Sequence, residues 1–387
     1  MRSKAARLLA VLAVGCFAVH AVSLPAHGAA GASAVPAPTP SASAPYLLLI
    51  TFAGKNTPQE MSVVKNSPYD GVGVMIGTAY DEGPAPSEQS LEPKFMQLKS
   101  AAGNKDVWPW VFINRMVGTN PNENNAQARK PYFQSIRAMD LDNKAGAKQA
   151  FLDDWRVALQ LAKHMGSPGV VLDLEYYNNY FISYAVSRLA DARGESQDRV
   201  IQEISQLGAQ MADIANQELP DGKIWCLVTA LAYPQMVRGQ AIYPTRAYVP
   251  IGIMQRLKQL HSRIQFIDGG EDSLGYCHTT LDDLKQDIRT REQKHASLEQ
   301  EFSGIFQLGG TITLWSDASV KQGWMRQGKC GTSSARNLDD LEPYLEELTR
   351  AYPYVWVYAA PVGGYDPFNP QVASKFHATV DKAKHSQ

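Results

Sequence analysis

Short apolar runs alternate along the chain with longer segments in which apolar side chains recur every three or four residues. The short runs are rich in β-branched and aromatic residues and have the length of a strand, whereas the longer segments have the period of a helix packed on one face. Eight runs of the first kind predict strands at residues 46–53, 69–76, 107–114, 169–176, 223–231, 263–268, 311–317 and 354–360.

A helical pattern follows each of these strands. The predicted helices cover residues 58–65, 92–101, 144–164, 196–217, 251–261, 281–302, 339–351 and 370–383. Eight strand-then-helix units are typical of a closed parallel barrel, so we expect the α/β class and a single (β/α)8 TIM barrel over residues 46–385. A doubly wound open sheet is the alternative, but residues 52–58, FAGKNTP, lack the glycine spacing of its phosphate-binding turn.

The N-terminal residues have the pattern of a secretion signal. Arg2, Lys4 and Arg7 precede an apolar run, and small residues follow it. We therefore expect a signal peptide over residues 1–28 and a secreted or periplasmic protein. In an alternative interpretation the signal ends before Cys16, which then carries a lipid that anchors the protein to the outer membrane.

Residues 29–45 are almost entirely Ala, Pro, Ser, Gly and Thr, which predicts a flexible linker. No later stretch of the sequence is long and apolar enough to predict a transmembrane segment.

Export allows disulfides to form. Cys226 lies inside an apolar run and predicts a buried thiol, which leaves Cys277 and Cys330 as the expected disulfide. Unpaired thiols throughout are the alternative.

Composition and charge narrow the function classes. The chain is 44% hydrophobic and 19% charged, as in ordinary globular proteins, and its net charge of -1 gives no basic excess for binding nucleic acid. The sequence has neither CxxC nor paired-histidine spacing, so we expect no metal site and no cofactor.

The predicted strand at residues 169–176, GVVLDLEY, ends in two acids. A period of two places Asp173 and Glu175 on one face, and Leu172 and Leu174 on the face that suits packing against helices. Both carboxylates are therefore expected to point inward at the rim where barrel enzymes carry their active sites. A structural ion pair at the rim, with Arg115 as partner, is the alternative.

Two crowded carboxylates raise the pKa of one member, as a general acid requires. We assign the proton donor to Glu175 and the supporting role to Asp173. A second carboxylate could be Glu271, after the sixth predicted strand, or Asp317, at the end of the seventh, and the sequence does not choose between them.

Polar and aromatic residues at other predicted strand ends suit sugar binding, because flat rings pack against pyranose faces while their edges remain polar. The candidate substrate-binding residues are Asn114, Arg115, Tyr80, Tyr176, Tyr177, Tyr233, Asp268, Trp315 and Trp356.

The Asp-x-Glu of GVVLDLEY resembles the fourth-strand signature of glycoside hydrolase family eighteen, the chitinase-like enzymes, over about eight residues. The resemblance implies that Glu175 protonates the leaving oxygen and that Asp173 assists the acetamido group of the substrate. Val171 departs from the signature, which has a further Asp there.

Together these features predict an exported glycoside hydrolase that acts on an oligo- or polysaccharide by carboxylate acid/base catalysis. We expect a monomer with a carbohydrate substrate. The alternative is a non-catalytic glycan-binding barrel.

Overall fold

Parallel strands lie side by side in one sheet, in the order β10-β11-β1-β2-β3-β4-β5-β8-β9. The computed structural model describes residues 44–51, 56–76, 86–113, 141–143, 146–175, 186–237, 240–274, 278, 280–313, 338–359 and 367–386. All of these belong to one compact unit, Ala44–Gln387. The strands span Tyr46–Ile50 (β1), Gly71–Met75 (β2), Asp106–Phe112 (β3), Gly169–Asp173 (β4), Lys223–Cys226 (β5), Gln265–Asp268 (β8), Phe306–Leu308 (β9), Gly310–Thr313 (β10) and Tyr354–Tyr358 (β11).

Gly309 is the point at which this sheet closes. It alone separates β9 from β10, and these two segments stand at opposite ends of the strand order. β9 pairs with β8 and β10 pairs with β11, so together they occupy the place of one strand between β8 and β11. The sheet is thus a barrel of eight parallel strands, which confirms the predicted fold class.

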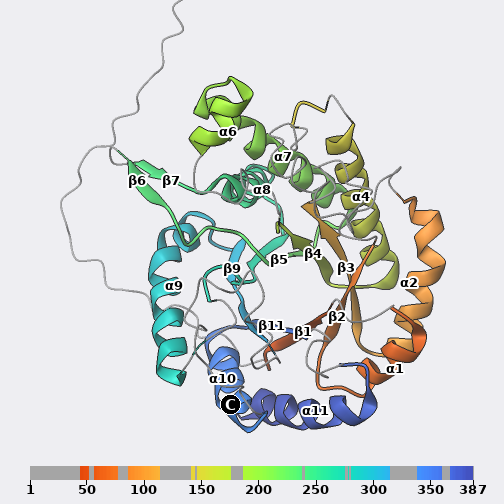
Figure 1. Cartoon of the computed structure of the whole chain (residues 1–387). Helices are drawn as coiled ribbons and strands as arrows, with labels where there is room; N and C mark the ends of the chain where they lie inside the picture. Colours follow the sequence, from red (N-terminus) through yellow and green to blue (C-terminus); the bar gives the residue numbers. More distant parts are fainter. Residues whose placement is uncertain are drawn as a thin grey trace, which may run out of the picture. The chain divides into compact units, whose positions relative to one another are not determined.

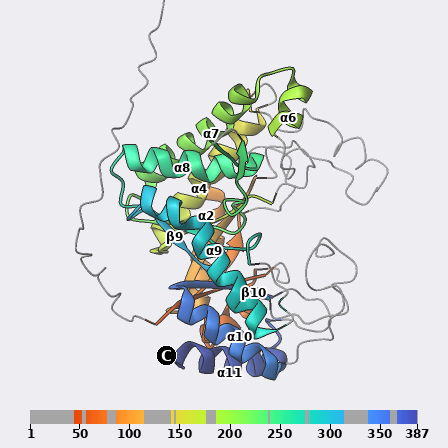
Figure 2. The same cartoon turned by 90° about the vertical axis from the view of Figure 1, so that its left-hand side faces the viewer.

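The connecting helices surround the strands (Figures 1 and 2). They span Pro58–Lys65 (α1), Glu88–Ala102 (α2), Ala147–Met165 (α4), Val186–Arg193 (α6), Gln197–Glu218 (α7), Tyr248–Gln259 (α8), Leu281–Glu301 (α9), Leu338–Ala351 (α10) and Pro370–His385 (α11). Eight of these nine lie within a few residues of the sequence prediction. None of the helices in the described part of the chain is long and apolar enough to cross a membrane.

Three short elements were not predicted. The first two are the helix α6 and the turn η3 (Thr245–Ala247), and the third is the antiparallel pair β6 (Gln235–Val237) and β7 (Gln240–Ile242). The short strand β9 also lies outside the predicted strands. The strands β6 and β7 and the turn η3 have three residues each, which is too short to show a period, whereas this reason does not apply to α6, which has eight.

Aromatic side chains fill the barrel interior. A period of two along each strand separates a lumen layer from an outer layer that packs under the helices. The lumen layer consists of Leu48, Ile50, Trp108, Trp110, Phe112, Val171, Trp225, Leu227, Val228, Ile267, Trp356 and Tyr358. Indole rings are larger than the branched aliphatic side chains usual in such barrels, so some strand positions facing them must be small.

Glycines supply that space. A Cβ on Gly71 would lie 2.6 Å from the Tyr46 hydroxyl, and one on Gly169 would lie 2.8 Å from the Trp108 ring and 2.1 Å from the Lys223 carbonyl oxygen. The glycines of β2 and β4 are therefore part of the packing of the lumen.

An ion pair ties the N-terminal end of the barrel to the last helix. Lys384 of α11 donates to both Asp70 oxygens, at 2.6 and 2.8 Å, and Asp70 also accepts the Leu47 N–H at 2.8 Å. Asp70 directly precedes β2, so this contact lies at the end of the barrel opposite the strands' carboxyl ends.

Cys226 is a buried free thiol, as predicted. Cys16, Cys277 and Cys330 lie outside the described residues, as do the signal peptide and nearly all of the linker. The disulfide and the lipid anchor therefore stay predictions.

We expect Gly169→Ala to lower the free energy of unfolding by about 2 to 3 kcal/mol, because the new methyl meets the backbone oxygen of Lys223, which cannot rotate away. Gly73→Ala is the matched control, since its methyl meets the mobile end of Ile50. Urea unfolding of both variants checks this, and equal losses would contradict it.

Candidate functional site

Asp173 closes β4 on the lumen side. Leu172 and Leu174 pack in the outer layer and Val171 in the lumen layer, which confirms the predicted directions of these side chains. Asp173 follows Val171 on the inner face and is only 2% exposed, and its Oδ1 accepts the backbone N–H of Glu175 at 2.8 Å. The two acids therefore adjoin each other at the carboxyl end of the strand, with Glu175 the more exposed.

The electrostatics of this pair favour a protonated Asp173. Burial, as the largest effect, and the charge of Glu175 raise the pKa of Asp173 well above its ordinary value. The Glu175 N–H, the Arg246 guanidinium and a hydrogen bond from Trp110 lower that pKa by less. Asp173 consequently holds its proton to a higher pH than an exposed carboxyl group would.

Tyr358 connects this pair to a third acid. Its ring ends β11 in the lumen layer. Burial raises the pKa of its hydroxyl, and the charges of Glu271, Glu175 and Asp173 raise it further, in that order. Carboxylates from the ends of β4 and β8 thus act electrostatically on one hydroxyl at the end of β11.

Glu271 lies in a turn, residues 269–272, that backbone hydrogen bonds fix against the end of β5. Gly269 donates its N–H to the Cys226 carbonyl at 2.7 Å and Glu271 donates to the Leu227 carbonyl at 3.1 Å. The Trp356 indole N–H donates to the Gly269 carbonyl at 2.8 Å. The position of Glu271 is therefore determined by β5 and by the lumen layer.

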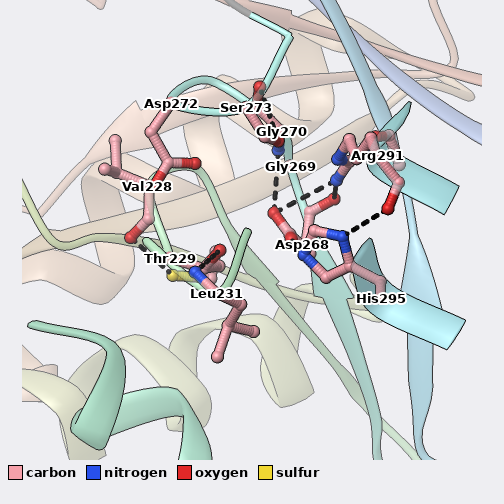
Figure 3. A network of polar contacts seen from close by, with 12 residues as sticks. Val228, Thr229, Leu231, Asp268, Gly269, Gly270, Asp272, Ser273, Arg291 and His295 are labelled. Atoms are coloured by element: carbon pink, nitrogen blue, oxygen red, sulfur yellow. Dashed lines mark hydrogen bonds and ion pairs between the residues drawn. The ribbon is translucent and has the colours of Figure 1, made fainter. Parts of the chain in front are cut away.

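Asp272 completes the turn and supports the loop after β5 (Figure 3). Its Oδ2 accepts the N–H of Ala230, and its carbonyl accepts the Tyr233 hydroxyl. Ala230 has φ +58°, a left-handed conformation that is costly for alanine, and the bond to Asp272 holds it there. Burial and the charge of Asp268 raise the pKa of Asp272 to about 6.

Arg246 belongs to this site although the sequence did not point to it. It lies in η3, is only 9% exposed, and lowers the pKa of both Asp173 and Asp272. Its turn follows no predicted strand, and the two aspartates are distant in sequence, so no local pattern marks it.

Two candidate substrate-binding residues are enclosed. Trp356 is 1% exposed within the lumen layer. Asp268 is 0% exposed and faces α9, where it pairs with Arg291 and His295. Phe266, two residues earlier, packs in the outer layer, so the strand period already places Asp268 on the helix side. We therefore give neither a place on the sugar-facing surface.

Tyr233 lies at the rim, with the Lys294 ammonium 5.0 Å from its ring centroid. The other candidates lie outside the described residues: Asp317, Asn114, Arg115, Tyr80, Tyr176, Tyr177 and Trp315. Their roles stay predictions.

One cluster with metal-ligand chemistry occurs within the described ranges, on the helices outside the barrel. Ligand atoms of Glu88 and Glu92 on α2 and His164 on α4 all lie within 4.8 Å of one another. His164 Nδ1 lies 2.9 Å from Glu88 and 3.2 Å from Glu92. These distances describe a partly exposed ion-pair group that joins the two helices.

The fold and site define a (β/α)8 barrel with acids gathered at the carboxyl ends of its strands. No known family model and no curated protein matches the sequence. The solved structures that resemble it have 7% to 10% identity. A GH5-4 broad specificity endoglucanase from Bacteroides salanitronis matches at 10% identity, over 87% of each chain, with a TM-score of 0.47.

Two other solved structures have different activities. A sugar phosphate isomerase/epimerase from Parabacteroides distasonis matches at 8% identity over 85% of this chain and 96% of that one, with a TM-score of 0.42. Endonuclease IV from Thermus thermophilus matches at 10% identity over 87% and 99%, with a TM-score of 0.43. Likenesses this weak assign no activity to the chain.

Asp272→Asn should stabilise the protein above pH 6. The folded-state pKa of about 6 exceeds the ordinary 3.8, so the carboxylate destabilises the fold fully above pH 6 and not at all below 3.8. Asparagine keeps the acceptor for Ala230 without the charge. Thermal unfolding between pH 3.5 and 8 should show a rise in Tm that grows with pH.

Asp268→Asn is the control of opposite sign. Burial alone would raise the pKa of Asp268, but Arg291, His295 and the Gly270 N–H together lower it to about 2. Its charge therefore stabilises the fold above pH 3.8, and that stability is lost as the pH falls toward 2. The variant should lose Tm at neutral pH, and equal signs for the two variants would contradict the assignment.

Proposed function

We propose that this chain is a glycoside hydrolase in which Glu175 donates a proton to the leaving oxygen, Asp173 supports it, and Glu271 is the second carboxylate. The observation that carries the proposal is the action of all three acids on the Tyr358 hydroxyl at the mouth of the barrel. In barrels of this kind, groups at the carboxyl ends of the strands are those that react.

Cleavage of a glycosidic bond needs two carboxyl groups in different states. One must carry a proton for the leaving oxygen, and another must be charged so that it can attack or stabilise the oxocarbenium-like centre, or activate water. The two acids at the end of β4 suit the first need, because burial raises the pKa of Asp173 and so favours its protonated form.

Asp173 and Glu175 act together in this proposal. Asp173 is the buried member and bonds the Glu175 N–H, so it fixes the backbone that carries the donor. In this proposal the two acids hold one proton, which rests on Asp173 before catalysis, passes to Glu175 and then goes from Glu175 to the leaving oxygen, so that both acids end as carboxylates. The two acids then divide storage and delivery of the proton between them.

Glu271 suits the role of the second carboxylate. Its charge is the largest electrostatic influence on Tyr358 after burial, ahead of the two acids of β4. Its backbone is anchored to the end of β5, so the residue is held at the rim before substrate binds. Asp317, the other candidate from sequence, lies outside the described residues.

An oligo- or polysaccharide substrate is proposed from the same site, with Tyr233 and the unplaced aromatic candidates as the sugar-contacting surface. We further propose that the protein is exported by its N-terminal signal and acts outside the cytoplasm as a monomer. The pattern of residues 1–45 supports export.

Glu175→Gln tests the activity. We expect turnover to fall by about 10² to 10⁴-fold, the usual contribution of a positioned acid, with binding retained because the amide keeps the shape of the carboxyl group. Release of reducing ends from a panel of soluble oligosaccharides, chito-oligosaccharides included, gives the rate, and calorimetry with the same sugars gives the affinity. Glu301→Gln, an exposed acid on the last turn of α9, is the control.

The alternative of a non-catalytic glycan-binding barrel makes a different prediction. In that case the wild-type protein binds a sugar of the panel without cleaving it, and Glu175→Gln leaves binding nearly unchanged. Hydrolysis by wild type that survives Glu175→Gln would contradict the assignment of the donor.

A further inference from the structure

Three ionisable side chains are enclosed between β8 and α9, away from the mouth of the barrel. Asp268, Arg291 and His295 are 0%, 1% and 0% exposed. Arg291 Nη2 lies 3.2 Å from Asp268 Oδ1, and His295 Nε2 lies 3.1 Å from Asp268 Oδ2 (Figure 3). We call these three residues the β8–α9 clamp.

Arg291 binds the backbone at the point where the barrel closes. Its guanidinium donates to the carbonyls of Asp268 and Gly309, the residues at which the chain leaves β8 and passes from β9 to β10. Pairing with β8 ends at Leu308, and β10 pairs with β11 instead. The guanidinium thus satisfies carbonyl groups where the regular ladder changes partner.

His295 completes the clamp from the next turn of the helix. Its Nδ1 faces the Arg291 carbonyl at 2.8 Å while its Nε2 faces Asp268, and its ring stacks on Phe306 of β9. Both ring nitrogens therefore lie within 3.1 Å of an oxygen atom of the clamp.

Stability alone does not explain such a cluster. Moving charges out of water is costly, and apolar side chains of similar volume often serve the fold as well or better. The other buried positions on this face of α9, including Leu284, Ile288 and Leu298, are apolar. What charged groups add is a fixed geometry, since Asp268 and Arg291 can satisfy their hydrogen bonds in few arrangements.

The fixed geometry extends to the turn that carries Glu271. Asp268 Oδ1 accepts the Gly270 N–H at 3.0 Å. Gly270 has φ +81°, and a Cβ there would lie 3.0 Å from Arg291 Cζ, so the backbone of the turn packs directly on the guanidinium. The next residue in the chain is Glu271.

We propose that Arg291 and His295 are positioning residues that act through Asp268 and the 269–272 turn to hold Glu271 in its reactive place. The inference rests on the proposed function, because it names what positions the second carboxylate of that site. Neither residue touches the substrate.

Arg291→Lys tests the proposal, since lysine keeps the charge but has one nitrogen in place of the two that reach the separate carbonyls of Gly309 and Asp268. His295→Gln is the milder second variant, which keeps a donor for Asp268 and serves if the first does not fold. We expect each to lower kcat by about 10- to 100-fold, the effect of a displaced reactive group, with KM changed less than about threefold.

A double-mutant cycle separates positioning from a general structural effect. Each substitution is repeated in a Glu271→Gln background, where no carboxylate remains to be positioned. We expect the clamp variant to add less than about a twofold loss there, because residues that act through one another are not additive. Equal fold-losses in both backgrounds would overturn the proposal.

Lys384→Met is the matched control, because it removes a half-buried ion pair and its backbone carbonyl bond at the opposite end of the barrel. It should lower Tm and leave kcat as in wild type. An unchanged kcat in both clamp variants despite a lowered Tm would show that the clamp is structural only.

A crystal structure of His295→Gln gives a readout that does not depend on activity. We expect the 269–272 turn and the Glu271 carboxylate to move relative to Tyr358. A turn that superposes on the wild-type turn overturns the inference whatever the kinetics. Failure of the proposed function is distinguishable, since it appears as absence of hydrolysis by wild type or survival of hydrolysis in Glu175→Gln.

Discussion

Closure of the parallel sheet is the constraint on which the site depends. A strand at an open edge leaves a row of backbone N–H and C=O groups without partners, and a barrel removes both edges at once. Here the closing strand changes partner at Gly309, from β8 to β11. Because all strands are parallel, closure brings their carboxyl ends to one rim. Asp173, Glu271 and Tyr358 meet there although long stretches of sequence separate them.

The aromatic lumen beneath this rim determines the chemistry of its acids. Rings of tryptophan, tyrosine and phenylalanine exclude water from the barrel interior, so a carboxylate that faces inward loses hydration that the rings do not replace. Asp173 consequently keeps its proton to a higher pH. The outer layer is equally apolar, yet Asp268 is ionised there, because Arg291 and His295 replace its lost water. Burial has opposite results at the two positions because, among the residues that the structure describes, only Asp268 has a guanidinium within ion-pair distance.

The sequence predicted the barrel because each strand and helix is specified locally by its own period. It also predicted the directions of Leu172, Leu174 and Asp173, since a period of two within one strand needs no tertiary information. The end of β8 was predicted correctly, but the ends of β4 and β5 were predicted three and five residues too late, because the strand-like sequence pattern continues after the ladder stops. The short β6 and β7 strands, by contrast, contain too few residues for any period to appear.

The site was harder to predict because it depends on contacts between elements. Arg246 influences Asp173 and Asp272 from a turn with no pattern of its own, so only the closed barrel reveals it.

The position of Asp268 is different, because the sequence of α9 did contain a signal for it. On α9 the buried positions Leu284, Ile288, Arg291, His295 and Leu298 recur at helical spacing, and two of the five are polar. A charged residue such as Arg291 on the buried face of a helix needs a buried partner of opposite charge. Asp268 is that partner. It lies on the same face of β8 as Phe266, which is the face toward α9. An acid at the end of a strand faces a substrate only when it lies on the same face of the strand as the lumen residues. The two-residue period alone therefore distinguishes Asp173, on the lumen face, from Asp268, on the helix face.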